Sequence, residues 1–259
     1  MNDTRVALII GTSSGIGYAT ALAFARKGIH VVTTARRVER LAQLEVAVRA
    51  LPAPHADILT IAADVTDANA MQVAVAKAVE RFGRLDILVA NAGLGQRGAF
   101  VDADWPDIEI VLRTNIDGVL HSVRAAVPAM KQSGGGQIVI ISSVAGQVAM
   151  PYSATYGATK AFVSSLAKSL RLELETDQIG VTDMLVGRTE TEFNQNRRGQ
   201  ARASSRLPAM SADYVADSIL RAVDRKQHTV VLRPFDRLIL LGNTLAPWLI
   251  ARLAKRQYK

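Results

Sequence analysis

Tyr156 and Lys160 are the two residues of this sequence whose types and spacing could transfer a proton. They lie four positions apart in a stretch with helical periodicity, so we expect their side chains on one helix face. A phenol has a pKa of about 10 in water and is a poor base at neutral pH. A nearby lysine ammonium favours the phenolate and lowers that pKa. The spacing alone is weak evidence, because such pairs also occur by chance.

Two further polar residues could complete such a site. Ser143 ends a predicted strand thirteen residues before Tyr156, where its hydroxyl could bind the oxygen of a substrate carbonyl. Asn115 stands inside a predicted helix, where a buried amide is more often structural than catalytic. Gln147 and Met150 follow shortly after the strand and are expected to contact the substrate. These residue types predict chemistry on a carbonyl or an alcohol, without naming the molecule.

A glycine-rich turn follows the first predicted strand and opens a predicted helix, in the order Gly11, Thr12, Ser13, Ser14, Gly15, Ile16, Gly17. Glycine permits a tight turn and lets the backbone approach a pyrophosphate closely at the N-terminus of the helix. The glycine spacing differs from that of the common dinucleotide-binding fingerprint. The turn therefore predicts a nucleotide site, though only weakly by itself, because turns often contain glycine.

The end of the second predicted strand bears on the choice between NAD and NADP. An acidic side chain there would bind the ribose 2′-hydroxyl and repel a 2′-phosphate. The sequence instead has Arg36 and Arg37 directly after the strand, and residues 33–37 include no carboxylate. Guanidinium groups bind phosphate in a bidentate manner. Two arginines can also simply begin a solvated helix, but their position favours NADP(H) as the cofactor.

Two turns after the third and fourth predicted strands fit a nucleotide that runs along the strand ends. The first turn holds Asp64, whose carboxylate could accept a hydrogen bond from an adenine amino group, followed by Val65. The second turn holds Asn91, Ala92 and Gly93. Residues of these types also form ordinary turns. Their contribution to cofactor binding is therefore inferred from their register with the glycine-rich turn.

Short apolar strands alternate with helical stretches along the sequence. The expected strands are residues 6–10, 30–35, 58–63, 85–90, 137–142, 181–186 and 229–232. The expected helices are one after the glycine-rich turn and residues 38–50, 69–82, 105–131 (broken early), 153–176 and 212–225. Apolar strands that alternate with helices indicate a parallel sheet covered on both faces. The fold class is therefore α/β, a doubly wound Rossmann sheet of about seven strands, with ligands at the carboxyl ends of the strands.

These motifs, in this order, resemble the short single-domain branch of the short-chain dehydrogenase/reductase superfamily, from Val6 to about Thr191. The matching residues are Gly11, Gly15, Gly17, Asn91, Ala92, Gly93, Asn115, Ser143, Tyr156 and Lys160. The resemblance implies an oxidoreductase that acts on CH–OH groups and transfers hydride between NADP(H) and a carbonyl or secondary alcohol. It also implies a homodimer or homotetramer, since family members are usually dimers or tetramers.

The resemblance also implies a role for each of the polar residues. Tyr156 would be the acid–base group, and Ser143 would bind the substrate oxygen beside it. Lys160 would hold the nicotinamide ribose and tune the tyrosine. Asn115 would hold a water against the lysine, as part of a relay to solvent.

The sequence departs from the family pattern at three positions. Ile10 stands before the first glycine where Thr is usual, and Ala90 replaces the first Asn of a common Asn-Asn-Ala-Gly. Val186 replaces the Pro of a Pro-Gly pair after the sixth strand, which affects the loop beside the nicotinamide amide. Thr189 and Thr191 of that loop are carried over as cofactor contacts.

Composition and charge narrow the function classes. The 259 residues include no cysteine, which excludes disulfides and thiolate chemistry, and the four histidines show no ligand spacing, so no metal site is expected. Residues 1–186 carry 17 basic and 17 acidic side chains, whereas residues 187–259 carry 14 and 6 and supply the whole net charge of +8. This indicates either a solvated basic surface or an anionic partner. No nucleic-acid-binding motif accompanies the charge, so no nucleic acid is expected.

A single domain over residues 1–259 accounts for this length. Residues 187–208 interrupt the alternation of strands and helices and are expected to form a substrate lid that is mobile without ligand. Residues 235–259 are expected to form an amphipathic helical tail. The tail would pack on the body or on a neighbouring subunit, or contact an anionic membrane peripherally. No signal peptide and no membrane-spanning stretch is expected, which indicates a cytoplasmic protein.

Two alternative functions stay open from the sequence. A catalytically silent nucleotide-binding scaffold of the same fold would lack one of the polar groups named above, and all of them are present. A membrane-surface-associated reductase of lipid-like or acyl-thioester substrates would use the basic tail. Oxidation of NADPH with a panel of carbonyl compounds discriminates between an enzyme and a scaffold.

Overall fold

The computed structural model describes residues 4–52, 56–199 and 208–257, apart from the side chains of residues 256 and 257. Its main sheet has seven strands in the order β3-β2-β1-β4-β6-β7-β9, and every neighbouring pair is parallel. The strands are β1 (Val6–Ile10), β2 (His30–Ala35), β3 (Ile58–Ala62), β4 (Ile87–Ala90), β6 (Gly136–Ser143), β7 (Ile179–Val186) and β9 (Thr229–Val231). The predicted doubly wound parallel sheet is confirmed.

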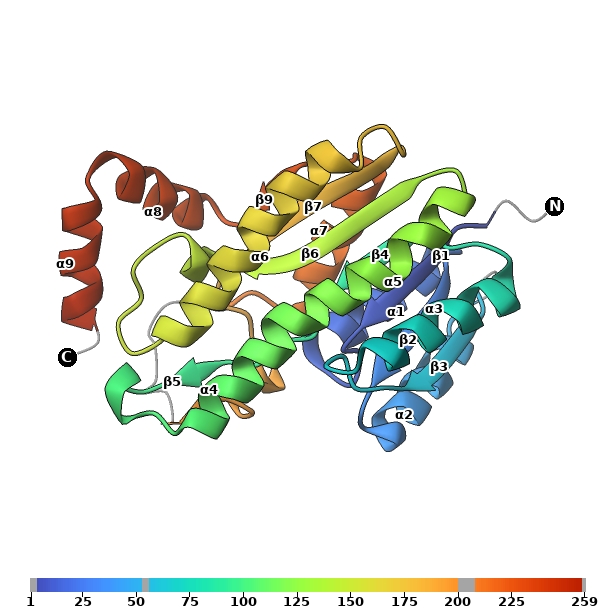
Figure 1. Cartoon of the computed structure of the whole chain (residues 1–259), viewed down its shortest axis with the longest axis horizontal. Helices are drawn as coiled ribbons and strands as arrows, with labels where there is room; N and C mark the ends of the chain where they lie inside the picture. The colour runs from blue at the N-terminus through green and yellow to red at the C-terminus, as the bar shows by residue number, and fades with distance from the viewer. Residues whose placement is uncertain (1–3, 53–55, 200–207, 258–259) are drawn as a thin grey trace.

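Helices cover both faces of this sheet (Figure 1). One layer contains α3 (Ala68–Phe82), α5 (Gly118–Gln132) and α6 (Ala154–Glu173), and the other contains α1 (Gly15–Arg26), α2 (Val38–Arg49) and α7 (Ala212–Asp224). In β1, Val6, Leu8 and Ile10 belong to the first core cluster, whereas Ala7 and Ile9 belong to the second. Because successive strand side chains point to opposite faces, an all-apolar strand must be covered on both sides.

The strand order reverses between β1 and β4. The chain winds from β1 outward to β3 on one side and then builds β4, β6, β7 and β9 on the other. Such a reversal separates the loops at the carboxyl ends of the two central strands and opens a crevice in which ligands bind. The predicted motifs all follow carboxyl ends of strands, so the topology brings them to one edge.

The long helical stretch predicted over residues 105–131 consists of three pieces. They are α4 (Trp105–Leu112), a π-helical turn (Arg113–Asp117) and α5. π-helical turns are rare and occur mostly at functional sites. Asn115 lies in this turn, and its buried side chain bonds to the backbone of Leu94 in the loop after β4. The early break in the helix therefore aims Asn115 at the crevice edge of the sheet.

The chain ends in α8 (Pro234–Leu245) and α9 (Pro247–Gln257), which we call the C-terminal arm. Figure 1 shows the arm, in red, extending beyond the end of the sheet, with α9 turned across the end of α8. A two-stranded parallel sheet of β5 (Gln96–Arg97) and β8 (Arg198–Gly199) lies toward the same end of the molecule. No helix among the described residues is both long and apolar enough to span a membrane.

Candidate active site

A cavity of about 940 Å³ lies at the carboxyl ends of the parallel strands. This volume falls within the range of roughly 300–1,000 Å³ that is typical of ligand pockets. The cavity runs from the loops after β2 and β3, past the glycine-rich turn, to the C-terminal arm. The predicted site residues that line it are Gly11, Ser13, Ser14, Gly15, Ile16, Arg36, Arg37, Asp64, Val65, Asn91, Ala92, Gly93, Ser143, Met150, Tyr156, Lys160, Thr189 and Thr191.

The glycine-rich turn has a backbone that glycine adopts most readily. Gly11 has a φ of 82° and Gly15 a φ of 59°, both in the left-handed region. A Cβ on Gly11 would lie 2.8 Å from the Cα of Ala92, so the loops after β1 and β4 meet here through their backbones. Helix α1 begins at Gly15, and no described side chain caps it at Ser14. Its first N–H groups and its dipole therefore suit an anion such as a pyrophosphate.

Gly17 lies behind the turn and does not line the cavity. A Cβ on Gly17 would lie 2.3 Å from the carbonyl oxygen of Gly11 and 2.6 Å from Nδ2 of Asn91. The same Nδ2 donates to the carbonyl oxygens of Ile10 and Gly11, at 3.1 and 2.9 Å. In the structure Gly17 has a packing role, because α1 approaches the turn too closely to admit a side chain, and its predicted contact with the cofactor stays a prediction.

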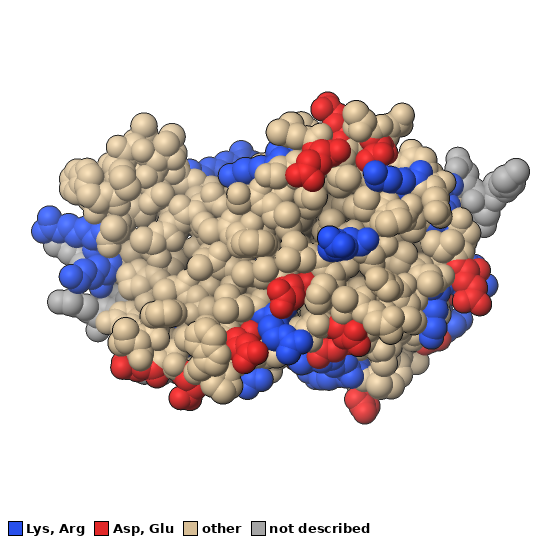
Figure 2. Space-filling view, in the orientation of Figure 1, with Lys and Arg blue, Asp and Glu red and all other residues tan. Residues whose placement is uncertain are grey.

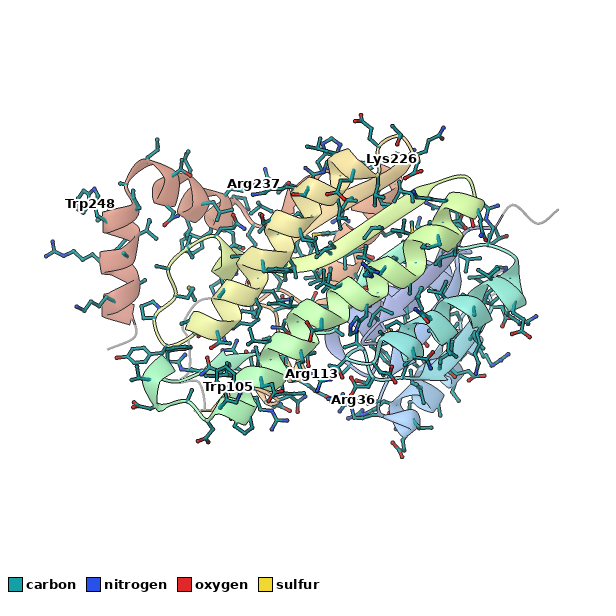
Figure 3. The ribbon with its side chains drawn as sticks, in the orientation of Figure 1. Arg36, Trp105, Arg113, Lys226, Arg237 and Trp248 are labelled. Carbon is teal, nitrogen blue, oxygen red and sulfur yellow. The ribbon has the colours of Figure 1, made fainter. Side chains whose placement is uncertain are left out.

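Arg36 and Arg37 lie beside the glycine-rich turn at one end of the cavity. Arg37 donates to the hydroxyl oxygens of Ser13 and Ser14, at 2.9 and 3.2 Å. Arg36 is the more exposed of the two, and its guanidinium lies 3.7 Å from the carboxylate of Asp64 (Figure 3). Two guanidinium groups and two hydroxyls thus surround this end, a donor set that suits a phosphate.

Tyr156 and Lys160 on α6 and Ser143 at the end of β6 come together along the cavity wall. The Lys160 ammonium donates to the carbonyl oxygen of Ile141 at 2.8 Å and lies 5.9 Å from the centre of the Tyr156 ring. The Ser143 hydroxyl donates to the carbonyl oxygen of Val186 at 3.0 Å and is also within hydrogen-bonding reach of the Tyr156 hydroxyl. A substrate oxygen could therefore contact both hydroxyls.

Burial has the largest effect on the pKa values of Tyr156 and Lys160. It raises the pKa of Tyr156 above its usual value, and the hydrogen bond with Ser143 and the charge of Arg197 only partly oppose it. Lys160 is not among the groups that oppose this rise, so the expected lowering of this pKa by the lysine stays a prediction. Burial also lowers the pKa of Lys160 to about 8, against the negative charge of Asp183. A phenol with a raised pKa stays protonated at neutral pH, as a general acid must.

Asn115 is fully buried and does not line the cavity. Its Oδ1 accepts from the N–H of Leu94 at 2.7 Å, and its Nδ2 donates to the carbonyl oxygen of Leu94 and to the Thr159 hydroxyl, at 2.9 and 3.0 Å. A Cβ on Gly93 would lie 3.3 Å from this Oδ1 and 3.5 Å from Nζ of Lys160. Asn115 is thus close to the lysine. Among the described residues its amide bonds only to Leu94, in the loop after β4, and to Thr159 on α6, and so links these two segments.

Gln147 was expected to contact the substrate and does not line the cavity. Its Nε2 donates to the Ser164 hydroxyl at 2.8 Å, because the short 3₁₀ helix Val144–Gly146 turns the side chain toward α6. Met150 does line the cavity. The substrate contact predicted at Gln147 is therefore corrected to a bond with α6.

Sequence reasoning missed Asp183, a fully buried carboxylate on β7. It accepts hydrogen bonds from the hydroxyls of Ser142 and Ser164, and its charge raises the pKa of Lys160. A single acidic residue in the apolar run of β7 was the available signal, but its partners lie on β6 and α6. Among the described residues, no group of three or more histidine and acidic side chains could hold a metal ion.

The loop after β7 adds Phe193, which the sequence did not single out, beside the predicted Thr189 and Thr191. Its Thr191 accepts from the N–H of Phe193, at the start of the 3₁₀ helix Glu192–Asn194. The Phe193 ring lies 5.7 Å from the Tyr156 ring, and both line the cavity. Thr189 pairs with Met210 in an isolated bridge, which ties down the start of the loop. Residues 200–207 of the predicted lid lie outside the described residues.

The sequence matches the family model for short chain dehydrogenase over residues 5–202. The match covers most of the chain, which therefore belongs to the short chain dehydrogenase family. A curated relative, sulfoacetaldehyde reductase 2 of Chromohalobacter salexigens, is 38% identical, with 88% of this chain and 92% of the relative covered. Dehydrogenase/reductase SDR family member 7B of Bos taurus is 32% identical over 96% of this chain and 79% of the relative.

Solved structures agree with this assignment. A short-chain dehydrogenase from Sphingobium yanoikuyae in complex with NADPH has a TM-score of 0.80 and 32% identity, covering 95% of this chain and 94% of its own. A short chain dehydrogenase/reductase from Burkholderia phymatum in complex with NAD has a TM-score of 0.83 and 26% identity. The match covers 94% of this chain and 95% of the Burkholderia chain. These neighbours support an oxidoreductase with a nicotinamide cofactor and differ in which cofactor they hold.

Proposed function

We propose that this protein is an NADP(H)-dependent oxidoreductase that interconverts a carbonyl compound and its secondary alcohol. One observation carries the proposal: a single cavity joins the uncapped N-terminus of α1 to the hydroxyl pair of Ser143 and Tyr156. The first feature suits a nucleotide pyrophosphate, and the second suits the oxygen of a carbonyl or alcohol. Nicotinamide-bound family structures support the combination.

Each polar residue then has a defined task. The bound nicotinamide supplies or accepts the hydride. Ser143 and Tyr156 hold the substrate oxygen by their hydroxyls, and in reduction Tyr156 donates its proton to that oxygen. Its raised pKa keeps the proton in place until negative charge develops there. The ammonium of Lys160 would then stabilise the phenolate and would also hold the ribose hydroxyls of the cofactor, while Asn115 fixes the loop that borders the lysine.

The preference for NADP(H) rests on Arg36 and Arg37. Both line the cavity beside Ser13 and Ser14, and a carboxylate that would bind a ribose 2′-hydroxyl is absent from the end of β2. Thr189 and Thr191 line the cavity farther along and are proposed as contacts to the nicotinamide end. Asp64 and Val65 are proposed as contacts to the adenine end of the cofactor.

Steady-state kinetics with NADPH and NADH, with ketones and aldehydes as substrates, test this proposal. We expect a preference for NADPH of about tenfold or more, and Arg36→Asp should abolish or reverse it. Arg49→Asp is the matched control, because Arg49 lies at the far end of α2 and pairs with Glu45. Equal efficiency of the wild type with both cofactors would contradict the NADP(H) proposal, and failure to oxidise either cofactor would favour the silent scaffold.

The C-terminal arm supports a contact with a further surface. Its outer face exposes Leu245 at 75%, Trp248 at 68% and Leu238 at 65%, and Trp248 points away from the body (Figure 3). These side chains are therefore not buried on the body of the protein. We infer that they pack in a homodimer or homotetramer, with peripheral contact to an anionic membrane as the alternative. Basic side chains gather beside α9 in Figure 2, and a cytoplasmic location stays a prediction.

Measurements of oligomeric state and of vesicle binding distinguish a neighbouring subunit from a membrane as the surface that covers the arm. We expect the wild type to sediment as a dimer or tetramer and Trp248→Glu to weaken that assembly. A monomer that floats with anionic vesicles, and does so less after the same substitution, would favour the membrane instead.

The segment 187–208, within the single domain proposed for residues 1–259, remains our candidate for a lid. Thr189 and Phe193 already line the cavity, and β8 of the same segment pairs with β5. Closure over bound NADP(H) and substrate would exclude water from the reacting atoms. Limited proteolysis at the Arg197–Arg198 bond tests this, because saturating ligands should protect it. Identical cleavage with and without ligands would indicate a static segment.

A further inference from the structure

The cavity changes character along its length. At the arginine end it is lined by hydroxyl and charged groups. The far end is lined by apolar side chains of the arm, namely Phe235, Ile239, Ile250 and Leu253, and by the loop after β7, which contributes Phe193 and the polar residues 194–198. The roles assigned above to Ser143, Tyr156 and Lys160 use none of these apolar residues. They therefore form a wall that the hydride and proton transfers leave unexplained.

The root of the arm is fixed against the strands that carry the reacting groups. Asp236 is buried and accepts two hydrogen bonds from Arg233, both at 2.7 Å. A Cβ on Gly187 would lie 2.4 Å from Oδ2 of Asp236, so α8 starts in direct contact with the end of β7. Farther along α8, Asn243 donates to the carbonyl oxygen of Gln147 at 3.0 Å. The arm thus spans the carboxyl ends of β6 and β7.

The inner and outer faces of the arm differ. Ile239 on α8 and Ile250 on α9 are half-buried and line the cavity. Leu238, the neighbour of Ile239, is 65% exposed and does not line it. The inner face thus continues the cavity with hydrocarbon only, apart from the paired Arg233 and Asp236 at its root.

We propose that the inner face of the C-terminal arm binds an apolar substituent of the substrate, so that the protein prefers ketones and alcohols with a long or bulky hydrocarbon group. This rests on the proposed reaction at Ser143 and Tyr156. Burying one more methylene against such a wall should improve binding by about threefold to fourfold, until the wall is filled. A short, strongly polar substrate would leave the wall wet and gain nothing from it.

A series of straight-chain 2-ketones from butanone to dodecanone tests the proposal. Binding to the NADP⁺-saturated protein is measured by calorimetry, and kcat/KM for reduction is measured with NADPH. Affinity and kcat/KM should both rise by at least about tenfold over the series. Ile239→Asp should lower the values for the long ketones at least tenfold more than those for the short ones, and Ile250→Ala should act in the same direction if Ile239→Asp does not fold. Leu172→Asp, at a position on α6 that is 74% exposed and does not line the cavity, should leave the series unchanged.

The outcomes separate this proposal from the proposed reaction. Affinity that rises with chain length without any reduction would support the apolar wall and overturn carbonyl reduction. Reduction that is independent of chain length, or an equal effect of Ile239→Asp and Leu172→Asp, would overturn the wall and leave the reaction standing.

A second, independent observation concerns the other end of the cavity. Glu192, in the loop after β7, lies between two arginines that follow β2. Its carboxylate accepts from Arg37 at 3.1 Å and from Arg40 at 3.2 Å. Arg37 also donates to Ser13 and Ser14, so the carboxylate accepts from a guanidinium of the donor set assigned above to a phosphate.

The geometry points to Glu192 as a residue that tunes cofactor choice, because its carboxylate competes with the 2′-phosphate of NADP(H) for Arg37. The proposal rests on the assignment of that phosphate to Arg36 and Arg37. A bound 2′-phosphate must displace Glu192 or share the guanidinium with it, whereas NAD(H) leaves the pair intact. Glu192 thereby narrows the preference for NADP(H). The three side chains are 30–45% exposed, so solvent screening keeps the effect modest.

Two nucleotide fragments test this without any turnover. Binding of adenosine 2′,5′-bisphosphate and of 5′-AMP is measured by calorimetry for the wild type, Glu192→Gln and Glu190→Gln. Glu192→Gln should bind the bisphosphate about threefold to tenfold more tightly and 5′-AMP within about twofold of the wild type. Glu190→Gln removes the same charge from the same loop, and Glu190 is exposed with its N–H bonded to Met210, so both ligands should bind as to the wild type.

Equal tightening by both substitutions would reveal a general charge effect and overturn the role of Glu192, as would no change in either. A wild type that binds the two fragments equally, while Glu192→Gln prefers the bisphosphate, would support competition and overturn the NADP(H) preference of the wild type.

Discussion

The two ends of the cavity are built in opposite ways. The cofactor end comes from turns at the ends of β1 to β4, where a few consecutive residues of each turn supply the contacts. Its polar groups bond to one another, as Arg37 does to Ser13 and Asn91 to the glycine-rich turn. The other end is lined by Phe193 and by the arm, segments far apart in sequence that both contribute apolar side chains to the cavity.

This difference shows which end of the cavity only a few sequences can build and which end many sequences can build. Pyrophosphate binding needs backbone geometry and a helix N-terminus, which few sequences provide, so the motif is recognisable. An apolar wall needs only hydrocarbon of the right shape, which many sequences provide. We therefore expect substitutions at the catalytic cluster to affect chemistry, and substitutions at the arm to affect which substrates are accepted.

Tyr156→Phe should produce the largest effect and lies on the chemical side of the comparison. It removes the donated proton and keeps the ring, so kcat should fall by roughly 10²–10⁴-fold while NADPH affinity stays within about threefold. Tyr152→Phe is the control, because Tyr152 is 46% exposed and does not line the cavity. Near-normal turnover of Tyr156→Phe would require a different acid and would break the comparison.

Lys160 should make the folded protein less stable at neutral pH than at alkaline pH. Its pKa is about 8 in the folded protein and about 10.4 in an unfolded chain. Between these values the unfolded chain binds a proton that the folded protein does not, so the free energy of unfolding rises with pH across this window. Below pH 8 the lysine is charged in both states, and the folded protein bears the full free-energy cost of burying that charge.

Denaturant titrations from pH 7 to pH 10.5 measure this. Relative to Lys160→Met, the wild type should gain about 1–3 kcal/mol over the window. Lys168→Met, on the exposed side of the same helix, should parallel the wild type. Parallel curves for the wild type and Lys160→Met would mean that the lysine keeps its ordinary pKa.

Gly187→Ala tests whether the contact of Gly187 with the Arg233–Asp236 pair positions the arm. The new Cβ would lie 2.4 Å from Oδ2 of Asp236 and 2.7 Å from Nη2 of Arg233, so the ion pair must shift. We expect a loss of about 1–3 kcal/mol in the free energy of unfolding and faster proteolysis in α8. Chain-length selectivity should weaken more than turnover of a short ketone. An unchanged melting temperature and cleavage pattern would show that the arm does not depend on this contact.

Asp183→Asn should give the smallest effect and sharpens the account of the buried lysine. Because the charge of Asp183 raises the pKa of Lys160, removing it should lower that pKa further below its usual value. The limb of the pH–rate profile that depends on the ammonium should therefore move to lower pH, by about half a unit to one unit. Asp224→Asn, a surface carboxylate paired with Arg5, should leave the profile in place. A shift toward higher pH would contradict this account.

Sequence reasoning recovered the sheet and brought Ser143, Tyr156 and Lys160 to one site. It failed where a side chain had a choice of partners. Gln147 was assigned to the substrate and bonds to Ser164 instead. Asp183 was overlooked because nothing in its own strand marks it as the partner of a lysine on another element.

By itself, the sequence determined the alternating strands and helices, the glycine-rich turn and the spacing of Tyr156 and Lys160. These are local features, set by side-chain periodicity and by backbone conformations that few residues adopt. The tertiary structure alone decided the direction of the Tyr156 pKa, the ion pair of Glu192 with Arg37 and the apolar inner face of the arm. Each of these depends on burial or on contacts between segments distant in the chain, and hydrophobic burial has no direction that a short motif could encode.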